Sequence, residues 1–304
     1  MTIDTTGTVL ITGPTGGLGR ATTLAMASRP AASRPDLLLV GRAGRALDEM
    51  ADAARTAGAV AYAIGCDLAQ LADVRAAGQK AKSLLADGSV RPLRGLVANA
   101  GVSVVDTEDA SADGYELTFA VNYLAHAQLI GDVLDALVAP ARIALLGSNT
   151  YHQNVFRRIL HVPPASWRDP VELARPAPGN GGVAYSDSKL AIMYYAHELQ
   201  RQAPAGINVV VFEPGFMPGT GLSRGHGPGM QRIGRVIERI PGVSSPSRSG
   251  PMLASVVLDD RWAHLRDGVF VVKDEVREVK PFANDPIREA RLWEVTDELL
   301  CARR

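Results

Sequence analysis

The stretch Val9-Leu-Ile-Thr-Gly-Pro-Thr-Gly-Gly-Leu-Gly19 decides the fold, because it joins an apolar strand to a glycine-rich turn and then to a helix. The spacing of Gly13, Gly17 and Gly19 allows a tight turn, close approach of a phosphate and close packing of the helix on the strand. The helix that follows presents free N–H groups and a positive dipole end. We therefore predict a dinucleotide-binding turn. Its predicted binding residues are Gly13, Thr15, Gly17, Leu18 and Gly19.

Short apolar runs recur along the chain and alternate with alanine-rich stretches of helical character. The runs lack a polar–apolar alternation, which is typical of strands buried on both faces of a parallel sheet. We expect strands at 8–12, 36–40, 60–65, 95–99, 142–147, 207–212 and 268–272. We expect helices at 19–29, 45–57, 71–86, 110–138 and 184–202. The pattern predicts an α/β fold, namely a Rossmann-type, doubly wound, mainly parallel seven-stranded sheet with helices on both faces, built by residues 1–304 as one domain.

Two segments interrupt this alternation, at about 150–183 and 216–250. Both are rich in Pro and Gly, and both follow strands whose carboxyl ends meet at the ligand-binding edge of such a sheet. We expect them to form a wall or lid over a substrate. The alternative is that both are surface insertions without a role in binding.

Composition excludes several classes of function. The 304 residues include 32 Lys plus Arg and 32 Asp plus Glu, so the net charge is zero and neither nucleic acid nor an anionic membrane is expected as a partner. Two cysteines cannot build a disulfide framework or a metal cluster, and the six histidines form no metal pattern. The chain starts without a signal-peptide pattern, and its apolar runs are too short to span a membrane. We expect a cytoplasmic protein without a metal.

The end of the second predicted strand bears on the choice of cofactor. Dinucleotide folds that prefer NAD place an acid there, whereas this chain has Gly41 and Arg42, with no Asp or Glu from 37 to 47. A guanidinium can hold a 2′-phosphate through two parallel hydrogen bonds, and a carboxylate would repel it. The sequence therefore favours NADP(H). The alternative is that Arg42 is an ordinary solvated side chain.

Tyr185 and Lys189 form the strongest catalytic candidate. They are four residues apart on a predicted helix and therefore share one face. A nearby ammonium favours the phenolate, so we expect Lys189 to lower the pKa of Tyr185 and let it shuttle a proton. Ser148 ends a predicted strand and could hold the same substrate oxygen, and Asn122 could hold a water that extends the proton path. Each residue alone also has a structural interpretation, such as packing or turn formation.

Together these motifs resemble the short-chain dehydrogenase/reductase family over nearly the whole chain. The resemblance is carried by Thr12-Gly-x-x-x-Gly-x-Gly19, Cys66-Asp-Leu68, Ala98-Asn-Ala-Gly101, Asn122, Ser148, Tyr185-x-x-x-Lys189 and Pro214-Gly215. It implies that Tyr185 is the general acid/base, that Lys189 lowers its pKa and contacts the nicotinamide ribose, and that Ser148 orients the carbonyl. It also implies a proton relay through Asn122. The further cofactor residues that it implies are Asp67, Leu68, Asn99, Ala100, Gly101, Pro214, Gly215, Phe216 and Thr220.

Within the family, the chain is most similar to the branch of protochlorophyllide reductases and retinol-dehydrogenase-like members. Light-dependent protochlorophyllide reductases carry a Cys directly after the Pro-Gly pair, where this chain has Phe216. Together with Met217 and the apolar insert residues, Phe216 favours reduction of another bulky hydrophobic ketone. Those insert residues are Val155, Phe156, Ile159, Leu160 and Trp167.

Two further questions stay open at the level of sequence. Family members often pair through two long helices, here within 110–138 and 184–202, and the sequence leaves the choice among a homodimer, a homotetramer and a monomer open. A catalytically silent dinucleotide-binding regulator or scaffold on the same fold is the alternative function, although such a protein would be expected to lose Tyr185 or Lys189.

Overall fold

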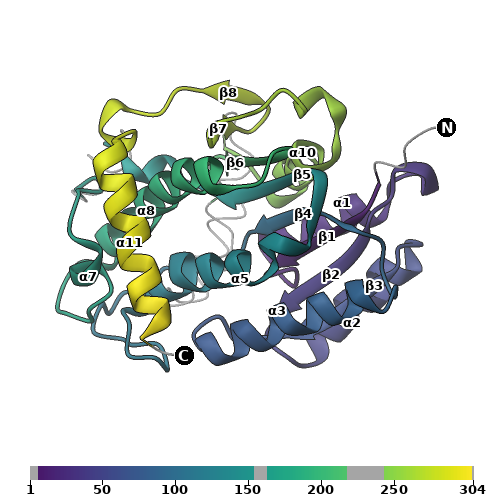
Figure 1. Cartoon of the computed structure of the whole chain (residues 1–304), viewed down its shortest axis with the longest axis horizontal. Helices are drawn as coiled ribbons and strands as arrows, with labels where there is room; N and C mark the ends of the chain where they lie inside the picture. Colours follow the sequence, from purple (N-terminus) through teal and green to yellow (C-terminus); the bar gives the residue numbers. More distant parts are fainter. Residues whose placement is uncertain (1–5, 154–162, 218–242, 303–304) are drawn as a thin grey trace.

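The computed structural model describes residues 6–153, 163–217 and 243–302. Its strands form one eight-stranded sheet in the order β3-β2-β1-β4-β5-β6-β7-β8 (Figure 1). The first seven strands are parallel, and β8 pairs with β7 in antiparallel orientation. The strands are β1 Thr8–Thr12, β2 Asp36–Gly41, β3 Ala61–Gly65, β4 Leu93–Ala98, β5 Leu137–Leu146, β6 Ile207–Glu213, β7 Val269–Val272 and β8 Glu275–Arg277.

This order confirms the predicted doubly wound α/β fold, with one strand more than expected. The strand order reverses between β1 and β4, and a ligand of such a sheet binds at the carboxyl edge of that switch point. The eighth strand is three residues long and exposed, so it carries no apolar run from which a strand could be predicted.

Helices cover both faces of the sheet because successive residues of each strand point to opposite sides. In β1, Val9 and Ile11 pack in one apolar cluster, whereas Leu10 packs in the other. The first cluster includes residues of α1 Gly17–Ala27, α2 Arg45–Thr56 and α10 Pro246–Leu258. The second includes residues of α3 Leu71–Ala86, α5 Ala125–Val133, α8 Gly181–Gln202 and α11 Pro286–Cys301. Burial on both faces accounts for the uninterrupted apolar runs of the strands.

The helix predicted at 110–138 is shorter and less regular than expected. It begins at Leu117, because the Glu116 carboxylate accepts the N–H groups of Thr118 (3.0 Å) and Phe119 (2.6 Å) and so caps the first turn. The helix then passes through a π-helical turn, Ala120–Leu124, before α5. It ends in a 3₁₀ turn at Leu134–Ala136, directly before β5. Gly114, with a φ of +80°, turns the chain ahead of this helix.

Two long helices, α10 and α11, were not predicted from the sequence. Each has a proline in its first turn, and α11 is capped by Asp285. The start of α10 lies inside the insertion expected at 216–250, of which 218–242 are outside the described residues. The other insertion contains α7 Pro170–Leu173 and ends where Asn180 caps α8. The chain also has 3₁₀ turns at Ala31–Ser33, Asn149–Tyr151, Asp260–Trp262 and Pro281–Ala283.

The C-terminal helix α11 packs across α8 and the helix that contains Tyr123 (Figure 1). The hydroxyl groups of Tyr123 and Thr296 hydrogen-bond at 2.6 Å. Tyr195 of α8 stacks on Trp293 with ring centroids 5.5 Å apart. The family resemblance implies that subunits pair through the helices predicted at 110–138 and 184–202. Helix α11 covers part of the surface of both.

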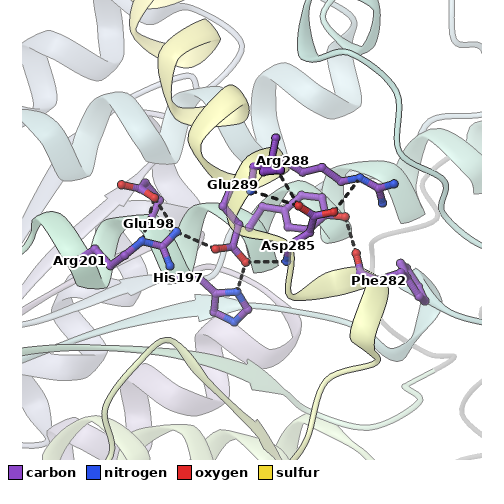
Figure 2. Close-up of polar contacts among 9 residues, drawn as sticks. His197, Glu198, Arg201, Phe282, Asp285, Arg288 and Glu289 are labelled. Atoms are coloured by element: carbon purple, nitrogen blue, oxygen red, sulfur yellow. Dashed lines mark hydrogen bonds and ion pairs between the residues drawn. The ribbon is translucent and has the colours of Figure 1, made fainter.

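A buried ionic cluster also joins α11 to α8 (Figure 2). Glu289 of α11 is fully buried and interacts with His197 Nδ1 at 2.7 Å and Arg201 Nη2 at 2.6 Å. It also accepts the backbone N–H of Asp285 at 3.1 Å. Burial alone would raise the pKa of Glu289, but the hydrogen bonds and charges of His197 and Arg201 outweigh it and hold the pKa below its usual value.

The turn from β1 into α1 is closely packed. Gly13 has a φ of +64°, which only glycine adopts without strain. A Cβ on Gly19 would lie 2.1 Å from the Gly13 carbonyl oxygen and 2.5 Å from Asn99 Nδ2. Gly16, one turn away, has no atom within 4 Å of such a Cβ.

Replacement of Gly19 by alanine should therefore destabilise the fold, because backbone and not a flexible side chain stands in the way. We expect the free energy of unfolding to fall by about 1–3 kcal/mol, the usual cost of overpacking. Chemical denaturation of Gly19→Ala and of the matched Gly16→Ala control measures the difference. Equal losses in the two variants would contradict the packing argument.

The ionic cluster predicts a second stability effect. Glu289→Ala leaves Arg201 paired with Glu198 alone and removes the carboxylate that His197 Nδ1 contacts, so the free energy of unfolding should fall by about 1–3 kcal/mol at neutral pH, the usual cost of unsatisfied buried partners. Because the folded pKa of Glu289 is depressed, its contribution is present above pH ~4.5 and is lost as the pH falls through the lower folded value. Urea denaturation of wild type and variant against pH should therefore converge in acid. A constant difference would contradict this assignment.

Candidate active site

The hydroxyl group of Thr12, the last residue of β1, connects the two strands of the switch point. Its Oγ1 accepts the backbone N–H groups of Asn99 and Ala100, both at 3.0 Å. The Asn99 side chain completes the connection by donating to the carbonyl oxygens of Thr12 (2.9 Å) and Gly13 (3.2 Å). Asn99 and Ala100 thus hold the glycine-rich turn in place from the neighbouring strand β4.

His126 extends this network to the helix that carries Asn122. Its Nδ1 must donate to the Asn122 carbonyl oxygen, 3.0 Å away, because a carbonyl only accepts. Nε2 is then the acceptor and receives the Thr12 hydroxyl at 2.9 Å. Burial lowers the pKa of His126 to about 4, so the ring is neutral at physiological pH. The π-helical turn around Asn122 and the end of β1 are therefore linked by one buried imidazole.

The turn between β1 and α1 fits an anionic group. Helix α1 begins at Gly17, and its N-cap residue Gly16 supplies no capping side chain to the first-turn N–H groups. Such a helix end, behind a turn that keeps Gly13 in the left-handed region, is a ready site for a phosphate. Thr15 is exposed at this turn, whereas Leu18 is buried and anchors the helix.

Arg42 directly follows β2 and is exposed beside this turn. The end of β2, just before Arg42, is hydrogen-bonded on both sides. Gly13 N donates to Val40 O at 2.9 Å, and Cys66 N donates to Gly41 O at 2.8 Å. Asp67 follows on the loop after β3, where its carboxylate accepts the N–H of Ala69 at 3.0 Å. Leu68 is buried beside it. The structure therefore groups Arg42 with Asp67 and Leu68, two of the predicted cofactor residues, at the ends of adjacent strands.

Ser148 and Tyr185 meet at the carboxyl edge of β5. Ser148 lies two residues beyond the strand, and its Oγ accepts from the Thr150 hydroxyl at 3.1 Å. Tyr185, on the first turns of α8, lies close enough for the same Ser148 side chain to lower the pKa of its hydroxyl group. The sequence pattern did not indicate Thr150, which fixes the serine from within the loop.

Lys189 lies near Tyr185, but not at its hydroxyl group. Lys189 Nζ donates to the Leu146 carbonyl at 2.8 Å and lies 5.4 Å from the centroid of the Tyr185 ring. Burial lowers the pKa of Lys189 to about 7. Burial first, and then the charge of Glu213, raise the pKa of Tyr185 to about 12 against the lowering effect of Ser148. Burial is the largest influence on this phenol, and the predicted lowering of its pKa by Lys189 stays a prediction.

Asn122 is fully buried, and its side chain is held by neighbouring groups. Its Oδ1 accepts the Val102 N–H at 2.7 Å, and its Nδ2 donates to Val102 O at 2.9 Å and Ser188 Oγ at 3.1 Å. Ser188 in turn donates to the Tyr185 carbonyl at 2.7 Å. Asn122 thus positions the start of α8 relative to the loop after Gly101, and its predicted role in a proton path stays a prediction.

The nicotinamide side of the predicted site follows β6. Gly215 adopts a φ of +88°, and Pro214 O accepts the Ser249 hydroxyl of α10 at 2.6 Å. Phe216 is 48% exposed, whereas Thr220 lies outside the described residues. Glu213, the last residue of β6, was not recognised from the sequence, although an acid at the end of an apolar strand and before Pro-Gly was a usable signal.

Asp187, two residues after Tyr185, fixes the segment that precedes α8. Asp187 is buried and pairs with Arg168 Nη2 at 2.7 Å, while its Oδ1 accepts the Ser166 N–H at 3.1 Å. Trp167 packs edge-on against Tyr194, with centroids 5.5 Å apart, so its side chain serves the packing of this segment on α8. The other apolar residues proposed for the substrate wall, Val155, Phe156, Ile159 and Leu160, lie outside the described residues.

Two features are absent from residues 6–153, 163–217 and 243–302. No group of three His, Cys, Asp or Glu side chains in these ranges is arranged to hold a metal ion. Within the same ranges, no helix is both long and apolar enough to cross a membrane.

Comparison with known proteins agrees with this geometry. The family description "short chain dehydrogenase" matches residues 7–159, half of the chain. Protochlorophyllide reductase A, chloroplastic, of Oryza sativa subsp. japonica is 30% identical over 97% of this chain and 80% of the rice protein. Protochlorophyllide reductase, chloroplastic, of Chlamydomonas reinhardtii is 29% identical over 77% of this chain and 63% of the algal protein.

Solved structures share the fold at lower identity. A short chain dehydrogenase from Burkholderia cenocepacia in complex with NADP has a TM-score of 0.65 and 21% identity, over 93% of this chain and 99% of its own. A blue fluorescent protein from a metagenomic library, in complex with NADPH, has a TM-score of 0.64 and 21% identity, over 90% of this chain and 98% of its own. From the family match and the rice relative, the chain belongs to the short-chain dehydrogenase/reductase family, whose members are nicotinamide-dinucleotide-dependent oxidoreductases.

Proposed function

We propose that this chain is an NADP(H)-dependent reductase of carbonyl compounds, with Tyr185 as the proton donor. The observation that carries the proposal is the interaction of the Ser148 side chain with the Tyr185 hydroxyl group at the carboxyl edge of β5. A substrate oxygen bound to both hydroxyl groups would lie beside the Pro214-Gly215 turn and the edge where the dinucleotide is expected.

The chemistry assigns a separate task to each side chain. When bound, the dinucleotide supplies a hydride to the carbonyl carbon. Ser148 holds the carbonyl oxygen, and Tyr185 gives that oxygen its proton. With its pKa raised by burial to about 12, Tyr185 carries at neutral pH the proton that it would donate. Lys189, in its charged form, lies over the ring and favours the phenolate that is left behind.

The preference for NADP(H) rests on Arg42. Its exposed guanidinium follows β2 at the position where an acid would bind a ribose hydroxyl, and no acid replaces it. An arginine there can hold a 2′-phosphate through two hydrogen bonds.

The proposed substrate is bulky and hydrophobic. Phe216 is nearly half exposed directly after the Pro214-Gly215 turn, and such a residue would contact an apolar ligand beside the nicotinamide. The relatives from rice and Chlamydomonas reinhardtii are named protochlorophyllide reductases. In this chain, Phe216 occupies the position of the cysteine found in the light-dependent enzymes. We therefore propose a light-independent reduction of a different ketone.

A regulator that binds the dinucleotide without turnover is the second candidate. It would keep the glycine turn and Arg42 but would not need the contact between Tyr185 and Ser148. Consumption of NADPH over a panel of hydrophobic ketones separates the two functions. Tight binding of NADPH without turnover of any ketone would favour the regulator.

Removal of the Tyr185 hydroxyl should abolish turnover and spare cofactor binding. We expect Tyr185→Phe to lower kcat by about 100-fold or more, because general acid catalysis contributes roughly that much. NADPH affinity, followed by fluorescence titration, should change little. Tyr62→Phe, a change of the same size on β3, is the matched control. Full activity of Tyr185→Phe would refute the proton-donor role.

Reversal of the charge at Arg42 should change the choice of cofactor. Arg42→Asp places a carboxylate where a 2′-phosphate would bind, so the KM for NADPH should rise far more than the KM for NADH, by about tenfold or more for a lost charged contact. Arg277→Asp, on β8 at the far edge of the sheet, repeats the charge change as a control. An equal response of both cofactors would contradict the assignment.

A further inference from the structure

The imidazole of His126, in the first turn of α5, contacts two parts of the candidate site through its two ring nitrogens. The residue is only 3% exposed. Nε2 accepts the hydroxyl group of Thr12 at 2.9 Å, from the end of β1 and 114 residues away in the chain. Nδ1 donates to the Asn122 carbonyl at 3.0 Å, in the π-helical turn before α5. Only the tautomer with its proton on Nδ1 makes both hydrogen bonds.

The hydrogen bond at Nε2 acts on the glycine-rich turn. The Thr12 hydroxyl group has one proton, which His126 receives, while its oxygen accepts the N–H groups of Asn99 and Ala100. Loss of the imidazole acceptor would leave that buried proton unsatisfied beside two other donors, which costs free energy. The Asn99 side chain also holds the carbonyl oxygens of Thr12 and Gly13. Nε2 therefore helps to fix the turn at which the dinucleotide is expected.

The hydrogen bond at Nδ1 acts on the helix that carries Tyr185. It holds the backbone of Asn122, whose side chain donates to Ser188 Oγ at 3.1 Å. Ser188 in turn donates to the Tyr185 carbonyl at 2.7 Å. Asn122 and Ser188 are both fully buried, so water does not replace these bonds. Nδ1 is thereby connected to the first turns of α8.

An imidazole that only filled space would not need two polar partners. An unpaired polar group costs free energy in the interior, and an apolar side chain of similar size would avoid that cost. Burial lowers the pKa of His126 to about 4, so the ring stays neutral at physiological pH. The same two hydrogen bonds therefore persist there, and the ring is a fixed connection between the two parts of the site.

We infer that His126 is a positioning residue that aligns the glycine-rich turn with the Tyr185 helix, its Nε2 serving cofactor binding and its Nδ1 serving turnover. The turnover part rests on the proposed function. The two bonds can be removed one at a time with neutral amides. His126→Asn places an N–H donor near the position of Nδ1 and leaves Thr12 without an acceptor. His126→Gln places an acceptor near the position of Nε2 and leaves the Asn122 carbonyl without this donor.

The first measurements need no substrate. Nitrogen-15 NMR of wild type with labelled histidine should show a proton on Nδ1 of His126 and none on Nε2. Amide hydrogen exchange then follows the two branches separately. The N–H groups of Asn99 and Ala100 should exchange about tenfold faster in His126→Asn, and those of 185–189 about tenfold faster in His126→Gln, as expected for one lost buried hydrogen bond.

Cofactor binding and turnover give the second comparison. We expect His126→Asn to raise the Kd for NADPH by about tenfold and to change kcat at saturating NADPH far less. His126→Gln should show the opposite split, with a kcat about tenfold lower for a ketone of the hydrophobic panel that wild type reduces. The same two substitutions at the exposed His264, before β7, are the matched controls and should change neither quantity.

Two further variants interrupt the same branches beyond the imidazole and serve if a His126 variant does not fold. Thr12→Val should reproduce the cofactor pattern, and Ser188→Ala the turnover pattern. A proton on Nε2 in wild type, or equal changes of exchange, Kd and kcat in both members of a pair, would indicate a structural role only and overturn the inference. If wild type binds NADPH and reduces no ketone, the proposed function fails, while the exchange and Kd measurements still decide the role of His126.

Discussion

The Thr12 hydroxyl group is the contact on which the site depends. It accepts two backbone N–H groups from the end of β4 and donates to the buried ring of His126. The same ring donates to the Asn122 carbonyl in the π-helical turn, and the Asn122 side chain reaches Ser188 beside Tyr185. The glycine turn and the start of α8, far apart in sequence, are therefore placed relative to each other by hydrogen bonds that burial shields from water.

Desolvation dominates the electrostatics of the site. It raises the pKa values of Tyr185 and Glu213 and lowers those of Lys189 and His126. All four groups are thereby shifted towards their neutral forms at physiological pH. Such a site holds protons on its acids, which suits a group that delivers a proton to a newly formed alcohol oxygen.

The sequence predicted the parts of the fold that follow from local pattern. The apolar runs of the first seven strands and the glycine turn before α1 were enough for the sheet and its switch point. The sequence reading missed α10 and α11, whose apolar faces are interrupted by polar residues and whose stability comes from packing on α1 and α8. It also placed the start of the 110–138 helix too early, because the cap at Glu116 depends on one side chain and not on a periodic pattern.

The sequence by itself determined the fold class and supplied the candidate site residues, because the glycine turn, Ser148, Tyr185 and Lys189 stand in motifs whose spacing follows backbone geometry. Only the tertiary structure decided the ionisation states of these residues and which further residues lie beside them. Lys189 Nζ lies 5.4 Å from the centroid of the Tyr185 ring and donates to the Leu146 carbonyl, a contact that the four-residue spacing did not indicate. Folding brings Glu213, at the end of β6, and His126, on α5, to the candidate site, because these elements meet only in the folded chain. Burial and the distances between charged groups control ionisation, and neither follows from the order of the residues in the sequence.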